Sequence, residues 1–336
     1  MSMQTRYLAL SFASGAFEIG IVVGAIGAAW PVTTVLATGL AYQLGAVFVD
    51  ASMELGTVWR RAALVAAATA VMAVPAEPIV FVAAAFATGL VLHQMRGDAP
   101  KGTTTLVKRG VRVAGFIIGA GAGIYVVPIA AAAILGVDIA ARAPVAAARS
   151  IPPLRMTAPH LVMVVHQSHY FTYAYALVML LVADLGVPSA LAGMIFSIGW
   201  VSYLLAERVL AALPASVTVV AGHLLTAACL VTIGTRHESL PFVLTAWFLS
   251  GFGGGSVFRL GQWVAASSSP AETHRWENIG HVVGVVTAGV IVTLTGQLMA
   301  AFYAGALLAV STAIGYSMLA ARRPTTQCGA GGTFAT

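Results

Sequence analysis

Two histidines and three tyrosines stand in the apolar stretch VMVVHQSHYFTYAYALVMLLVADLG, residues 162–186. On a helix, residues three, four and seven positions apart share one face, so His166, His169, Tyr170 and Tyr173 form a single polar stripe. Imidazoles and phenols that face lipid are costly. We therefore expect this stripe to point inward, into a water-reachable hollow shared by two helix bundles.

Three kinds of chemistry suit such a stripe. The imidazoles could carry protons, since the ordinary pKa of histidine is about 6.5. The imidazoles and phenols could instead hydrogen-bond to a polar or aromatic substrate and stack on it. His166 and His169 could also bind copper or zinc, which imidazole suits, with Met163 one turn earlier as a further ligand. A structural role, with both histidines bonded to neighbouring helices, stays open.

A lone carboxylate marks the first apolar segment. Glu18 lies eleven residues after Tyr7 in SFASGAFEIGIVVG, about 16 Å along a helix at about 1.5 Å per residue, and thus near the bilayer midplane. A charge at that depth costs about 2.5–3.5 kcal/mol, so Glu18 should face a wet cavity or a partner. It is a candidate proton carrier, and a purely structural pairing is the alternative.

Two further groups lie toward the cytoplasmic ends of their segments. Arg259, in GGGSVFRLGQW, could hold an anionic group, pair with Glu18, or extend to the membrane surface. Glu277 and His281 are four residues apart in ETHRWENIGH and could relay protons from the cytoplasm. The simpler interpretation of this second pair is a capped helix start with ordinary loop charges.

Composition sets the class of protein. Of 336 residues, 59% are hydrophobic and only 8% are charged, whereas soluble domains carry about 25% charged residues. Long apolar runs from end to end indicate an all-α polytopic membrane protein. The net charge is +6, but the basic residues fall between the apolar runs. They therefore set membrane topology and do not indicate a nucleic-acid partner.

Turn residues and charges predict twelve transmembrane helices. Fifteen of the seventeen basic residues then fall on one side, which places both termini in the cytoplasm. The competing eleven-span interpretation, with one kinked helix around Pro128, would scatter these charges over both faces. The predicted spans are 7–29, 33–49, 60–75, 78–95, 110–126, 128–147, 159–183, 188–210, 215–235, 240–264, 278–297 and 300–320.

The longest break lies near the middle and divides the chain into halves. We predict two pseudo-symmetric six-helix bundles, 1–148 and 159–321, joined by a cytoplasmic linker, 149–158, and followed by a flexible tail, 322–336. GFIIGAGAG at 115–123 and GHVVGVVTAG at 280–289 are loosely similar, as an internal repeat would require.

In this architecture the chain resembles the major facilitator superfamily of secondary transporters. Gly45, Asp50, Arg60 and Arg61 match the order of that family's loop between spans two and three, with wider spacing. The glycine-rich run 115–123 is similar to the family's exporter-associated pattern, without its proline. The resemblance implies alternating access, a cytoplasmic gate formed by Asp50 with Arg60 and Arg61, and export.

These observations predict a proton-coupled secondary transporter of a small polar or amphipathic organic molecule in the cytoplasmic membrane. Transport of copper, zinc or a metal chelate through His166 and His169 is one alternative. A membrane-embedded enzyme is less favoured, because the sequence has no nucleophile motif or cofactor fingerprint. We expect protons, substrate and lipid as partners, a monomer, and neither cofactor nor nucleic acid.

Overall fold

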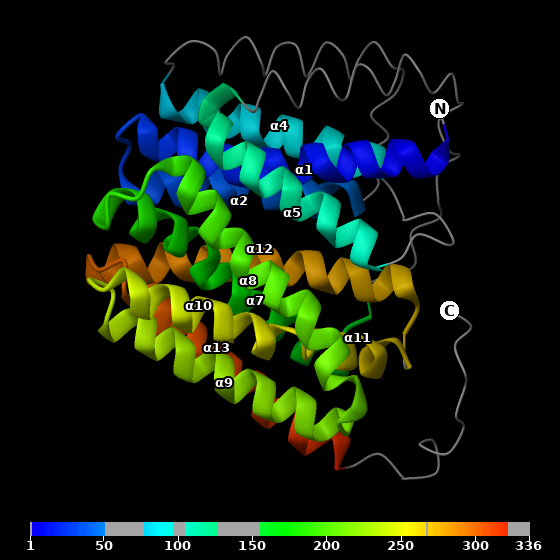
Figure 1. Cartoon of the computed structure of the whole chain (residues 1–336). Helices are drawn as coiled ribbons and strands as arrows, with labels where there is room; N and C mark the ends of the chain where they lie inside the picture. Colours follow the sequence, from blue (N-terminus) through cyan, green and yellow to red (C-terminus); the bar gives the residue numbers. More distant parts are fainter. Residues whose placement is uncertain (1, 51–76, 97–104, 126–154, 267, 322–336) are drawn as a thin grey trace.

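In the computed structural model, the described part of the chain is entirely helical. It comprises residues 2–50, 77–96, 105–125, 155–266 and 268–321. Within it, six helices or helix pairs are long and apolar enough to cross a membrane: α1, α8, α9, α10 with α11, α12 and α13. The helices run side by side, with the start of α1 and the end of α13 at the same end of the molecule (Figure 1). That arrangement fits an even number of crossings.

The first group of helices comes from the N-terminal part of the chain. Within it α1 packs on α5, and α2 packs on α4. The predicted spans 60–75 and 128–147 lie outside the described residues. The described elements are α1 (Met3–Gly27), α2 (Val32–Asp50), α4 (Pro78–Arg96) and α5 (Thr105–Ala122), which continues in a 3₁₀ turn (Gly123–Tyr125).

The second group contains the remaining helices. Two of the predicted spans, 215–235 and 300–320, coincide with α9 and α13. Helix α7 packs on α12 and α13, while α10 packs on α8 and α9. The elements are α7 (Ala158–Met179), which continues as a π-helical segment (Leu180–Asp184), α8 (Ser189–Val209), α9 (Ala215–Thr235), α10 (Leu240–Gly254), α11 (Val257–Ala265), α12 (Pro270–Thr295) and α13 (Ala300–Ala320).

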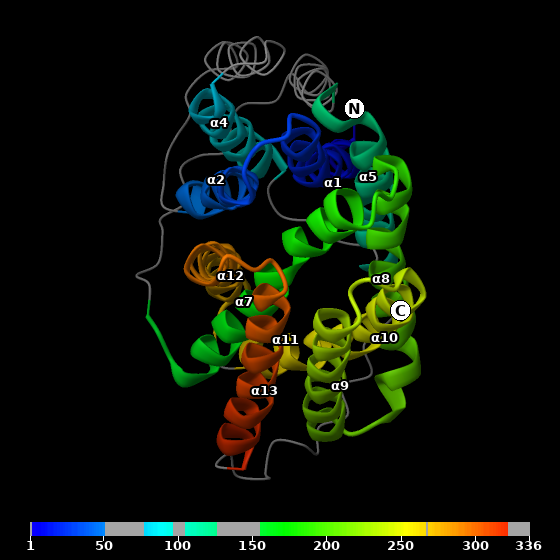
Figure 2. The same ribbon diagram turned by 90° about the vertical axis from the view of Figure 1, so that its left-hand side faces the viewer.

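The two groups meet along two seams. Helix α2 packs on α12 along one seam, and α5 packs on α8 along the other. Helices α1 and α7 approach each other between these seams (Figure 2). This arrangement places the polar residues of α1 and α7 where the two groups face each other.

Glycines four residues apart bring paired helices close together in both groups. On α5, a Cβ added to Gly115 would lie 2.8 Å from the backbone nitrogen of Ala16 on α1. On α12, a Cβ added to Gly280 would lie 2.8 Å from the carbonyl oxygen of Val164 on α7. Gly119 and Gly284, four residues further on, approach α1 and α7 in the same way. The two similar sequence segments therefore make equivalent contacts, which supports the predicted internal repeat and gives these glycines a packing role.

The structure differs most from the sequence prediction at two spans. The predicted span 240–264 is interrupted between Gly254 and Val257, where Gly253 packs closely against α9. Helix α12 begins at Pro270 instead of 278, because the Ser269 hydroxyl caps it by accepting a hydrogen bond from the backbone N–H of Glu272 at 3.2 Å. The predicted loop charges around Glu277 therefore lie on the first turns of a helix.

Candidate functional site

An ion pair lies between α1 and α5. The Glu18 side chain is 5% exposed, and its Oε2 pairs with Nη2 of Arg112, whose side chain keeps 24% exposure. Arg112 lies inside the predicted span 110–126 and stands on the third turn of α5. Glu18 thus has the partner that its depth requires, and this partner is Arg112, not Arg259.

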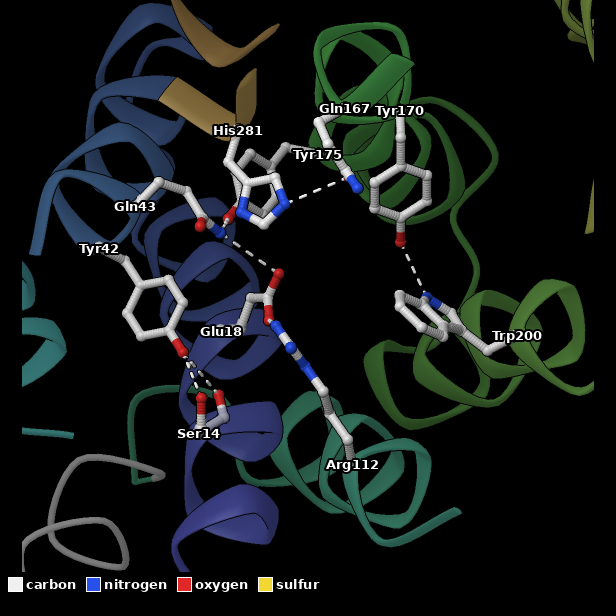
Figure 3. Close-up of polar contacts among 10 residues, drawn as sticks. All are labelled: Ser14, Glu18, Tyr42, Gln43, Arg112, Gln167, Tyr170, Tyr175, Trp200 and His281. Carbon is white, nitrogen blue, oxygen red and sulfur yellow. Dashed lines mark hydrogen bonds and ion pairs between the residues drawn. The ribbon is translucent and has the colours of Figure 1, made fainter. Parts of the chain in front are cut away.

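An amide links this pair to the second group of helices. Nε2 of Gln43, on α2, lies 3.4 Å from Oε1 of Glu18 and donates to the Tyr175 hydroxyl of α7 at 2.9 Å. Beside it, the Tyr42 hydroxyl lies 2.5 Å from the Ser14 hydroxyl. Polar side chains from α1, α2, α5 and α7 therefore form one connected network (Figure 3).

The opposite wall comes from the second group. Nε2 of His281 lies 3.3 Å from Oε1 of Gln167, and the indole N–H of Trp200 donates to the Tyr170 hydroxyl at 2.8 Å. These four side chains are half-buried and point toward the Glu18 network (Figure 3). We refer to this assembly as the central site. It consists of Glu18, Tyr42, Gln43, Arg112, Gln167, Tyr170, Tyr175, Trp200 and His281.

A second polar assembly lies inside the second group of helices. His166 and His169 of α7 gather with His223 of α9, with one potential ligand atom from each within 4.8 Å of the others. Nδ1 of His166 lies 2.7 Å from Nε2 of His223. We call these three residues the histidine cluster. All three are buried, with 4%, 3% and 1% exposure.

The predicted stripe on α7 is therefore divided. His166, His169 and Tyr173 lie inside the second group and do not face a hollow shared by both groups, so the prediction is wrong for these three of its four residues. Tyr173 packs in the interior of the second group, with ring centroids 6.0 Å from Trp247 and 6.4 Å from Phe302. Tyr170 turns toward the central site. The stripe spans about 100° of the helix surface, and the boundary between the bundle interior and the seam falls inside that arc.

The other predicted residues have separate locations. Nη1 of Arg259 donates to the Gln262 side chain at 3.5 Å, one turn further along α11. Glu277 pairs with His274 at 3.3 Å, whereas His281 faces Gln167, so the two members of the predicted relay have different partners.

The structure also bears on the predicted cytoplasmic gate and on Met163, the predicted third metal ligand. Asp50 is the last residue of α2, but its side chain, like Arg60 and Arg61, lies outside the described residues. Met163 packs in an apolar cluster with Val219 and Leu260. The donor that joins His166 and His169 is thus His223 and not Met163.

Sequence reasoning did not identify His223 of the histidine cluster, or these residues of the central site: Tyr42, Gln43, Arg112, Gln167, Tyr175 and Trp200. Gln43 and His223 are polar residues within apolar segments, and that property alone marks them as candidates. The signal for Arg112 was weaker, because it follows Lys108 and Arg109 and continues their basic run.

No protein-family model matches this chain, and no curated protein sequence matches it. Solved structures do resemble it. A POT family transporter in complex with 5-aminolevulinic acid has a TM-score of 0.68 at 12% identity, over 94% of this chain and 95% of that one. The nucleoside transporter NupG has a TM-score of 0.65 at 11% identity, over 96% and 100%.

A bacterial homologue of the iron transporter ferroportin, in an inward-facing state, has a TM-score of 0.64 at 12% identity, over 96% of this chain and 100% of that one. These neighbours are transporters of the major facilitator type. At such identities the likeness concerns the fold, and the chain is a multi-pass membrane protein with a major-facilitator-like fold.

Proposed function

We propose that this protein is a proton-coupled secondary transporter that moves a small polar or amphipathic organic molecule across the cytoplasmic membrane by alternating access. The observation that carries the proposal is the buried Glu18–Arg112 pair, which is connected through Gln43 to Tyr175 of the opposite helix group. Ionisable groups inside a membrane protein characteristically mark substrate or ion pathways. The transporters among the structural neighbours support the same class of function.

The central site offers suitable contacts for such a solute. The Arg112 side chain is 24% exposed, and its buried Nε has no hydrogen-bond partner among the described residues, so this guanidinium suits an anionic group. Tyr170 and Trp200 present aromatic rings, and Gln167 and His281 present polar atoms, all half-buried. A small number of polar groups beside aromatic surface is typical of small-molecule sites.

A cavity lies at the end of the helices remote from the start of α1. It has a volume of about 860 Å³ and is lined by residues of both groups, including Trp30, Val35, Asp184 and Leu298. In the proposed mechanism this cavity is the vestibule on the outer side of the membrane, and solute exchanges there when the groups rock apart.

The Glu18–Arg112 pair supports the proposed proton coupling. Protonation of Glu18 removes the negative charge that holds Arg112, so the guanidinium becomes available to an anionic group of the solute. Deprotonation restores the pair and expels that group. The hydrogen bond between Gln43 of α2 and Tyr175 of α7 joins the two helix groups. Glu18 lies beside Gln43, so a change in its charge is transmitted to the interface between the groups, which must open during transport.

The test begins with thermal stabilisation of the purified protein by nucleosides, dipeptides, amino acids and organic anions, because a ligand stabilises the state that it binds. Flux of each stabilising compound is then measured in liposomes under imposed pH gradients of both directions. We expect Glu18→Gln to lose pH-driven flux and to keep exchange of solute across the membrane. Glu238→Gln, which changes a carboxylate that is 73% exposed, is the matched control.

Unchanged proton-driven flux in Glu18→Gln would remove Glu18 from the mechanism. Chemical turnover of a stabilising compound in detergent, where no vectorial transport exists, would favour the membrane-enzyme alternative. The metal-transport alternative depended on His166 and His169, which lie inside one helix group. The structure therefore favours an organic solute at the central site.

A further inference from the structure

We propose that His166, His169 and His223 form a binding site for a transition-metal ion of the zinc or copper type, held as a resident ion within the second helix group. The three imidazoles are contributed by α7 and α9, and all three are buried. This inference is independent of the proposed transport function, since it concerns a different set of residues.

The spacing of the donor atoms suits a metal. One nitrogen from each ring lies within 4.8 Å of the others, and one pair is already 2.7 Å apart. Around an ion with bonds of about 2.0–2.1 Å, tetrahedral ligand atoms are roughly 3.3 Å apart. The three nitrogens are therefore close enough to surround an ion once the closest pair moves apart.

The orientation of His223 is fixed in the manner of a metal ligand. Its Nδ1 lies 2.7 Å from the carbonyl oxygen of Val219, with the Ser256 hydroxyl at 3.3 Å. A carbonyl can only accept, so the proton of the neutral ring is on Nδ1, and Nε2 directs its lone pair toward the cluster. Metal-binding histidines characteristically donate their second N–H to a carbonyl or carboxylate in this way.

His169 supplies the second observation. Its Nδ1 is buried and makes no hydrogen bond of normal distance and angle to the residues that the structure describes, although the backbone of His166, one turn earlier, interacts with the ring. An unsatisfied polar atom in such surroundings is costly, about 1–3 kcal/mol. Coordination of a metal ion through this nitrogen would compensate that cost.

The type and burial of the donors narrow the choice of ion and its role. Imidazole nitrogens suit zinc and copper, whereas magnesium and calcium take oxygen ligands. A transported ion must reach both sides of the membrane, but these three residues have at most 4% exposure. An ion held here would instead fasten α7 to α9.

The first test measures metal content. Protein expressed with added zinc and copper, and purified without chelator, should contain near-stoichiometric metal by elemental mass spectrometry. His169→Ala and His223→Ala should lose it, whereas His237→Ala, at a partly exposed position after α9, should retain it. Wild-type protein that neither retains nor takes up zinc or copper would overturn the proposal.

A second test distinguishes coordination from a hydrogen-bonded cluster. His169→Cys replaces one ligand by another, so Co²⁺ bound to this variant should give a thiolate-to-cobalt charge-transfer band. His169→Ala, which keeps the native cysteines, should give none. Equal spectra for the two variants would contradict the assignment, even where both variants fold well.

The final measurement separates the resident ion from a cargo. Liposomes that carry the wild-type protein and enclose a zinc-sensitive dye should give no larger zinc-dependent signal than protein-free liposomes. Zinc flux would overturn the resident role. Metal content is measured in detergent, so a failure of the transport proposal would leave its outcome unaffected.

Discussion

At the scale of single residues, the Glu18–Arg112 pair combines a stabilising and a functional role. Each charge is acceptable at its depth only because the other is present. The 24% exposure of the Arg112 side chain shows that this end of the pair is not fully enclosed by protein. The same interaction that keeps α1 on α5 is thus the one that a proton or an anionic solute would break.

Neutralising one member of this pair should destabilise the protein more than neutralising both. Glu18→Gln leaves an unpaired guanidinium, and removal of one partner from a buried pair costs about 3–5 kcal/mol. We expect the lower end of this range, because the Arg112 side chain is only partly buried. Arg112→Gln should behave similarly, and the double variant should recover most of the loss.

The measurement is a double-mutant cycle of unfolding free energies in mixed micelles. Arg236→Gln, at an exposed position after α9, is the matched control for loss of a guanidinium. Additive losses for the two changes would show that the pair contributes no coupling energy.

The sequence was informative about which residues are unusual and less so about their partners. Glu18, His166 and His169 stand out because they are ionisable residues in apolar runs. Their partners Arg112 and His223 lie 94 and 57 positions away from Glu18 and His166. Such pairings depend on how the helices pack, and spacing along a single helix gives no information about them.

At the scale of helices, close contacts through glycine hold each group together. Gly284 of α12 faces Ser168 and Phe171 of α7, and an added Cβ would lie 2.8 Å from the Cβ of Phe171. The corresponding contact in the first group joins Gly119 of α5 to Ala16 of α1. These positions therefore control how near the inner helices α1 and α7 lie to their neighbours.

Gly284→Ala should destabilise the protein by about 1–3 kcal/mol, as expected for overpacking a tight contact. Gly289→Ala, on the same helix, is the matched control, because its added Cβ would meet nothing within 4 Å. That change should be neutral or stabilising, since alanine favours a helix over glycine by about 1 kcal/mol. Equal melting temperatures for the two variants would contradict the packing role.

Helix boundaries were predicted best where turn residues are unambiguous. The ends of α9 and α13 match the sequence prediction. The predicted start of α12 lies too late in the chain, because polar residues in the first turns of this helix resemble a loop. The interruption of the tenth predicted span follows from glycines that allow close packing on α9. Its position depends on tertiary contacts that hydropathy does not report.

At the scale of the whole molecule, two helix groups are joined mainly along the α2–α12 and α5–α8 seams. Motion between such groups requires that one end of a seam can separate. The α5–α8 seam offers a suitable place to prevent this. An ideal Cβ on Gly121, at the end of α5, lies 3.6 Å from the Cβ of Ala190, at the start of α8.

A disulfide at this position should stop transport. The Cβ–Cβ separation falls within the range of about 3.5–4.5 Å that disulfides require, so Gly121→Cys/Ala190→Cys should form a cross-link in a background with Cys229→Ser and Cys328→Ser. The oxidised protein should bind its stabilising ligand but lose flux, and reduction should restore flux. Each single variant, treated with the same oxidant, is the control. Full flux through quantitatively cross-linked protein would mean that this end of the α5–α8 seam stays closed throughout the transport cycle. The two helix groups would then have to separate at another place.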